Sequence, residues 1–116
     1  MRALTALGLL ILADLVSGVS RARGREAAPG AAMEPRAISI AGFEFAPAEL
    51  TVSVGDSVAW INDDAFRHTT TADSGAWASA ELTRGQRFVF VPRRPGRFPY
   101  HCTAHPVMRA VIHVRE

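Results

Sequence analysis

Hydrophobic and polar residues alternate with a period of two in short runs after residue 34, and Gly, Pro and Asp separate these runs. No stretch there carries the apolar stripe of a helix. The positions expected to face a core are Ile38, Ile40, Leu50, Val52, Val54, Val58, Trp60, Phe88, Phe90, Phe98, Tyr100, Cys102, Ala110, Ile112 and Val114. The pattern predicts an all-β domain, a two-sheet Greek-key sandwich of seven or eight short strands.

Turn residues indicate how these strands are connected. Gly55-Asp56 predicts a tight hairpin that leads into Val58 and Trp60, and a second turn is expected over Pro92 to Gly96. The segment 72–83 has no regular alternation. We expect it to be a connection that runs outside the sheets.

The N-terminal residues have the composition of an exported protein's leader. Arg2 is followed by an apolar run to Val16, and small residues follow at Ser20 and Ala22. The run is shorter than the roughly 20 residues that span a bilayer, and Asp14 interrupts it, so a permanent membrane helix is the weaker interpretation. We expect a secretory signal over 1–22, a flexible leader over 23–36 and a folded domain over 37–116. The mature protein is then periplasmic, without stable membrane insertion.

Length and charge narrow the possible functions. The chain has 116 residues, which is enough for one domain, and 48% of them are hydrophobic, as expected of a packed core. Thirteen basic and eleven acidic residues give a net charge of +2. Residues 1–33 carry four Arg and two acids, so the whole excess lies there and the remainder is neutral. A neutral body argues against a nucleic-acid-binding protein.

The single cysteine has three potential metal ligands as companions. One Cys cannot form an internal disulfide, and a lone thiol in an oxidising compartment is a liability unless it is buried or bound to a metal. Cys102, His105 and Met108 follow the spacing Cys-x-x-His-x-x-Met on one short connection between strands. His68 comes 34 residues before Cys102 and must reach the site from a different strand.

This donor set suits copper. A thiolate, two imidazoles and a weak thioether make the trigonal His₂Cys site with a long axial Met that binds Cu(I) and Cu(II). Zinc prefers four strong ligands, and iron–sulfur clusters need more cysteines. His101 and His113 alternate with inward-facing residues on their strands, so we expect both to point outward.

Two segments resemble a known family. The run Tyr100–Arg109, and Gly55–Asp64 leading to His68, resemble the cupredoxins, the small blue copper proteins, of the amicyanin and plastocyanin type. The likeness covers roughly 37–115. It implies one type 1 copper per chain, held by His68, Cys102, His105 and Met108.

The same resemblance implies a function and partners. The protein would be an exported electron carrier rather than an enzyme, with His105 as its partly exposed electron port. Its partners would be redox proteins such as a c-type cytochrome or a periplasmic dehydrogenase, and we expect a monomer. Phe66, Pro106 and Val107 are candidates for an apolar docking patch around His105.

The sequence departs from its relatives near the first histidine. Thr69 stands where relatives commonly have an Asn that ties the two ligand loops together, and a hydroxyl is expected to replace that link only in part. Ala65-Phe66-Arg67 occupies a stretch where relatives often place a Pro.

Two other functions use the same ligands. A periplasmic copper-delivery or storage module would bind copper without redox turnover, although such proteins expose their ligands and Cys102 lies on a core-facing strand. A copper oxidase or nitrite reductase domain needs a catalytic copper as well. His101 and His113 alone cannot build one unless another subunit contributes ligands.

Overall fold

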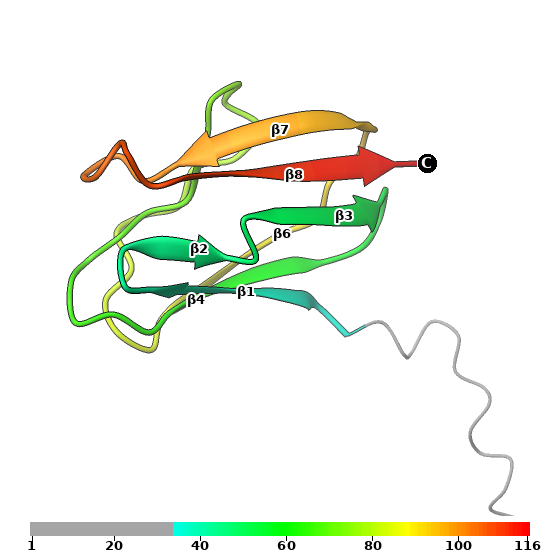
Figure 1. Cartoon of the computed structure of the whole chain (residues 1–116). Helices are drawn as coiled ribbons and strands as arrows, with labels where there is room; N and C mark the ends of the chain where they lie inside the picture. The colour runs from blue at the N-terminus through cyan, green and yellow to red at the C-terminus, as the bar shows by residue number, and fades with distance from the viewer. Residues whose placement is uncertain (1–33) are drawn as a thin grey trace, which may run out of the picture. The chain divides into compact units, whose positions relative to one another are not determined.

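The computed structural model describes residues 34–116, so the predicted signal 1–22 and most of the predicted leader 23–36 lie outside the described residues. Within these residues eight strands form two four-stranded sheets, which confirms the predicted sandwich (Figure 1). The strands are β1 (Arg36–Ala41), β2 (Glu44–Ala46), β3 (Glu49–Ser53), β4 (Val58–Asn62), β5 (Thr71–Ala72), β6 (Arg87–Phe90), β7 (Gly96–His101) and β8 (Arg109–Arg115).

The first sheet has the order β2-β1-β4-β6. Its central pair, β1 and β4, is parallel, with Ile38 opposite Trp60. At the two edges, β2 pairs antiparallel with β1 and β6 pairs antiparallel with β4. The second sheet has the order β3-β8-β7-β5, in which β3 and β8 are parallel and β7 pairs antiparallel with both β8 and β5. Each sheet therefore joins strands that are distant in the sequence.

Most of the core between the sheets consists of residues that the alternation selects. Ile38, Ile40, Val58, Trp60 and Tyr100 are fully buried. Phe88, Phe90, Phe98 and Ala110 are partly buried and pack against this cluster. No helix within residues 34–116 is long and apolar enough to cross a membrane.

The predicted hairpin at Gly55-Asp56 is wrong. A turn does form, with the Asp56 N–H donating to the Ser53 carbonyl at 3.0 Å and Gly55 at a φ of 95°. However, β3 and β4 belong to different sheets, so this turn carries the chain across the sandwich. The alternation also ends early, because β3 stops at Ser53 and Val54 is 38% exposed instead of facing the core.

The segment expected to lie outside the sheets contributes to the core as well. Its first residue, Ala72, belongs to the short edge strand β5, and the rest runs as a loop to Thr83. From that loop Trp77 and Leu82 are buried, and the Trp77 ring lies 5.4 Å from that of Trp60 and 4.7 Å from that of Phe90. The loop thus covers the opening between the edge strands β5 and β6.

Candidate metal centre

Three of the predicted ligands lie on the connection between β7 and β8. Cys102 directly follows β7, and Met108 directly precedes β8. Two turns shape the loop, because the His105 N–H donates to the Cys102 carbonyl at 3.3 Å and the Met108 N–H to the His105 carbonyl at 2.8 Å. The Cys102 N–H donates to the Met108 carbonyl at 3.2 Å and closes the loop at its base. The sheet register therefore fixes both ends of the ligand loop.

His68 reaches the site from the connection after β4. Its backbone pairs with Leu82, donating to the Leu82 carbonyl at 3.1 Å and accepting from the Leu82 N–H at 2.8 Å. The fully buried Asn62 holds the intervening turn, since its amide donates to the carbonyls of Phe66 at 2.9 Å and Leu82 at 2.7 Å. Its side-chain oxygen accepts the Asp64 N–H at 2.8 Å. Asn62 satisfies these backbone groups and so defines the path that leads to His68.

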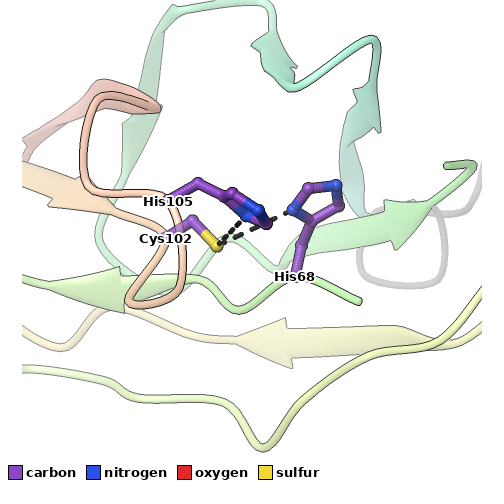
Figure 2. A group of neighbouring side chains, drawn as sticks. All are labelled: His68, Cys102 and His105. Carbon is purple, nitrogen blue, oxygen red and sulfur yellow. Dashed lines mark hydrogen bonds between the residues drawn. The ribbon is translucent and has the colours of Figure 1, made fainter. Parts of the chain in front are cut away.

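The side chains of His68, Cys102 and His105 converge (Figure 2). The Cys102 sulfur lies 3.7 Å from Nδ1 of His68 and 3.8 Å from Nδ1 of His105. A metal bonded to nitrogen at about 2.0 Å and to sulfur at about 2.3 Å, with about 120° between the bonds, separates the two atoms by about 3.7 Å. Both sulfur–nitrogen distances therefore match those of a trigonal metal site.

The ligand candidates differ in their access to solvent. His68 and Cys102 are fully buried, whereas His105 is partly exposed. Met108 is buried at the end of the same loop and belongs to the core cluster. The cluster is thus open to solvent on the His105 side.

Thr69 links the two ligand loops. Its hydroxyl oxygen accepts the Thr103 N–H at 2.9 Å and lies 3.2 Å from the Thr103 hydroxyl. Its own N–H donates to the Cys102 sulfur at 3.4 Å. The short Thr69 side chain, expected to replace the link only in part, makes contact with both the backbone and the side chain of the opposite loop.

Two residues at the site were not identified from the sequence. Asp64 lies 2.8 Å from Nε2 of His68, on the side of the ring away from Cys102, and also accepts the N–H groups of Gly42 and Phe43. Burial opposes ionisation of Asp64, but the hydrogen bonds from Phe43, Gly42 and His68 outweigh it and lower the pKa of the carboxyl. The position of Asp64 four residues before His68 was the available signal in the sequence.

The second such residue is Phe43, on the turn between β1 and β2. Its ring meets that of His105 edge-on at 5.0 Å and that of His68 at 5.3 Å. Phe43, Phe66 and Val107 are 41%, 58% and 88% exposed. An apolar surface, here called the His105 face and defined by Phe43, Phe66 and Val107, therefore lies near the exposed ligand candidate.

The other two histidines lie away from the cluster, as expected. His101 Nδ1 is 2.6 Å from Asp73, whose other oxygen accepts from Arg109 at 2.6 Å, and His113 lies 3.2 Å from Glu49. The His101 hydrogen bond and the Arg109 charge lower the pKa of the Asp73 carboxyl, although partial desolvation opposes them. Both histidines are engaged with surface carboxylates.

The chain was compared with known proteins. No protein-family model matches it. Amicyanin from Paracoccus denitrificans is 34% identical over 80 residues, which cover 65% of this chain and 61% of that protein. The solved structure of an oxidised amicyanin variant matches with a TM-score of 0.67 and 31% identity over 70% of this chain and 82% of that one. The chain belongs to the cupredoxin family. It is similar in sequence and structure to amicyanin.

Two further structures show the breadth of the match. A purple cupredoxin from Nitrosopumilus maritimus gives a TM-score of 0.63 at 27% identity, over 68% of this cupredoxin and 98% of that chain. A Cu-containing nitrite reductase from Thermus scotoductus gives a TM-score of 0.68 at 27% identity. This match covers 72% of this cupredoxin but only 23% of that chain. This cupredoxin spans about three fifths of the length of the amicyanins it matches in sequence. Its cofactor is copper, for which His68, Cys102 and His105 form the candidate cluster.

Proposed function

We propose that this cupredoxin carries single electrons between redox proteins through one type 1 copper. His68, Cys102 and His105 would hold the metal equatorially, and Met108 would be its axial ligand. The observation that carries the proposal is the convergence of the Cys102 sulfur with two imidazole Nδ1 atoms at 3.7 and 3.8 Å. Copper bound there supplies a one-electron couple between Cu(II) and Cu(I).

The surroundings of the ligands suit electron transfer. The loop of Cys102 is closed by backbone hydrogen bonds, and Thr69 ties it to the loop of His68. Ligands held this firmly keep their positions when the charge of the site changes, so little reorganisation accompanies gain or loss of an electron. Burial of His68 and Cys102 excludes water from that side of the site.

We propose His105 as the point at which electrons enter and leave. It is the partly exposed member of the cluster, and the His105 face gives a redox partner an apolar surface to dock on. Phe66 and Val107 were expected there with Pro106, and Phe43 adds a ring in contact with His105. A c-type cytochrome or a periplasmic dehydrogenase is the kind of partner proposed for an exported carrier of this family.

An enzymatic role is not proposed. A nitrite reductase or oxidase needs a catalytic copper besides this site, and His101 and His113, which could have contributed ligands, instead face Asp73 and Glu49. We propose that the domain acts as a carrier whose reactions take place on its partners.

The test is to load the purified domain with Cu(II) and record visible absorption and electron paramagnetic resonance spectra, with Cys102→Ala as the control. We expect an intense thiolate-to-copper band and a narrow copper hyperfine splitting, both lost in the control. Cycles of reduction and reoxidation by a one-electron mediator should restore the full band. A protein that binds copper without colour would contradict the carrier proposal and favour copper delivery or storage.

A further inference from the structure

The carboxylate of Asp64 lies where three groups from two separate segments meet. One oxygen accepts the Gly42 N–H at 2.9 Å, and the other accepts the Phe43 N–H at 3.1 Å and lies 2.8 Å from Nε2 of His68. Asp64 supplies the carboxylate that these groups share, and its side chain is 15% exposed. It therefore connects the turn between β1 and β2 with the histidine of the metal centre.

The contact with His68 determines which ring nitrogen carries the proton. In this contact the carboxylate oxygen of Asp64 accepts the hydrogen bond, so Nε2 is the ring atom that donates a proton to it. Nδ1 then keeps its lone pair, and it is this atom that lies 3.7 Å from the Cys102 sulfur. Because the ring of His68 is fully buried, water does not compete for Nε2. Asp64 thus leaves the correct nitrogen of His68 free to bind a metal.

The contacts with Gly42 and Phe43 hold a strained turn. Both residues have positive φ, 60° and 62°, a conformation that is unfavourable for a residue such as Phe43 with a Cβ atom. In this conformation successive N–H groups point to the same side and form a concave binding site for an anion, which the Asp64 carboxylate occupies. The turn places the Phe43 ring nearly perpendicular to the rings of both His68 and His105.

We infer that Asp64 is a positioning residue of the metal centre, which fixes the tautomer and orientation of His68 and anchors Phe43 beside His105. The part that concerns copper rests on the proposed function, whereas the tautomer can be measured in the metal-free protein. A carboxylate behind a metal-binding histidine raises the basicity of the ligand, and its negative charge favours Cu(II) over Cu(I). Loss of such a partner typically lowers metal affinity 10–100-fold.

Three variants separate these effects. Asp64→Ala removes the acceptor and the charge. Asp64→Asn removes the charge and keeps one oxygen that can accept from Nε2. Asp63→Asn is the matched control, because it deletes the same charge one residue away on an exposed side chain that bonds Ser39 instead of His68.

The first measurement is the tautomer of His68 in each metal-free protein, from nitrogen-15 NMR of the imidazole ring. We expect the Nε2-protonated form in the parent, in Asp63→Asn and in Asp64→Asn, and loss of that preference in Asp64→Ala. An unchanged tautomer in Asp64→Ala would overturn the inference. If Asp64→Ala does not fold, parent-like Cu(II) affinity and potential in Asp64→Asn would overturn it instead.

The second measurement is the dissociation constant for Cu(II) and the reduction potential. Relative to Asp63→Asn, we expect Asp64→Ala to bind Cu(II) about 10–100-fold more weakly. Asp64→Asn should raise the preference for Cu(I) about tenfold, which corresponds to about 59 mV for one electron. Values for both Asp64 variants within twofold of the control would contradict the role. A parent protein that binds no Cu(II) would refute the proposed function, while the tautomer comparison would still decide the role of Asp64.

Discussion

Residues 34–116 of this cupredoxin contain two histidine–aspartate pairs with the same chemistry and opposite surroundings. His68 is fully buried, and its Nε2 contacts Asp64 while its Nδ1 faces the Cys102 sulfur. His101 is 24% exposed in its side chain, and its Nδ1 contacts Asp73, which also binds Arg109. The carboxylate in the first pair satisfies backbone N–H groups, whereas that in the second pair satisfies a guanidinium. Burial and the remaining partners therefore decide whether such a pair builds a metal site or a surface ion pair.

Removal of each histidine should give the largest difference between the pairs. We expect His68→Ala to abolish the thiolate-to-copper band and weaken Cu(II) binding by more than about 100-fold, since losing only an outer partner of a ligand costs 10–100-fold. His101→Ala should keep the band, because its ring faces Asp73. Copper titrations followed by absorption check both. A parent-like band in His68→Ala would remove the distinction between the two pairs.

A smaller effect is expected when the hydrogen bond between Thr69 and Thr103 is removed, because this bond ties the loop of His68 to the loop of Cys102. Thr69→Ala leaves the Thr103 N–H without its partner, so the metal-free protein should lose about 1–2 kcal/mol of unfolding free energy. Thr69→Ser, which retains the hydroxyl, is the control and should lose less. Urea unfolding measures both. Equal losses would mean that the methyl group, and not the hydrogen bond, stabilises this link.

The smallest effect on stability is expected when the charge of Asp73 is removed from the exposed His101–Asp73 pair. The pKa of the Asp73 carboxyl is lower in the folded protein than in the unfolded chain, where it is about 3.9. At pH values above the unfolded pKa, the ionised carboxylate therefore stabilises the fold. This contribution is lost as the pH falls through the lower, folded pKa. The difference in stability between the parent and Asp73→Asn should therefore be largest near neutral pH and shrink in acid. Added salt should also reduce it. Thermal unfolding at pH 7 and pH 3 tests this, and a difference independent of pH would contradict it.

The sandwich and the Cys102–His105 pair of the metal centre could be predicted because both depend on local patterns. Alternation identified core residues such as Ile38 and Tyr100, and the spacing of Cys102 and His105 placed two donors on one short loop. The hairpin at Gly55 failed because a turn sequence specifies that the chain reverses, and does not specify which sheet the next strand joins. Competition between long-range strand pairings decides that choice.

The surroundings of the metal centre were harder to predict for a similar reason. Asp64 is near His68 in the sequence, but its contacts with Gly42 and Phe43 depend on the pairing of β1 with β4. Phe43 is an exposed aromatic residue outside any periodic pattern, so only its place beside His105 reveals a role. Such contacts are set by the packing of the sheets and not by a motif.

The position of β8 has a consequence for the order of folding. This strand lies between β3 and β7, so half of the sandwich cannot assemble before residues 109–115 are available. All four ligand candidates precede β8 in the sequence, yet its pairing with β7 closes the base of the loop from Cys102 to Met108. The chain therefore carries all its ligand candidates before the strand that closes their loop. The metal pocket therefore depends on a C-terminal strand that supplies none of its ligand candidates.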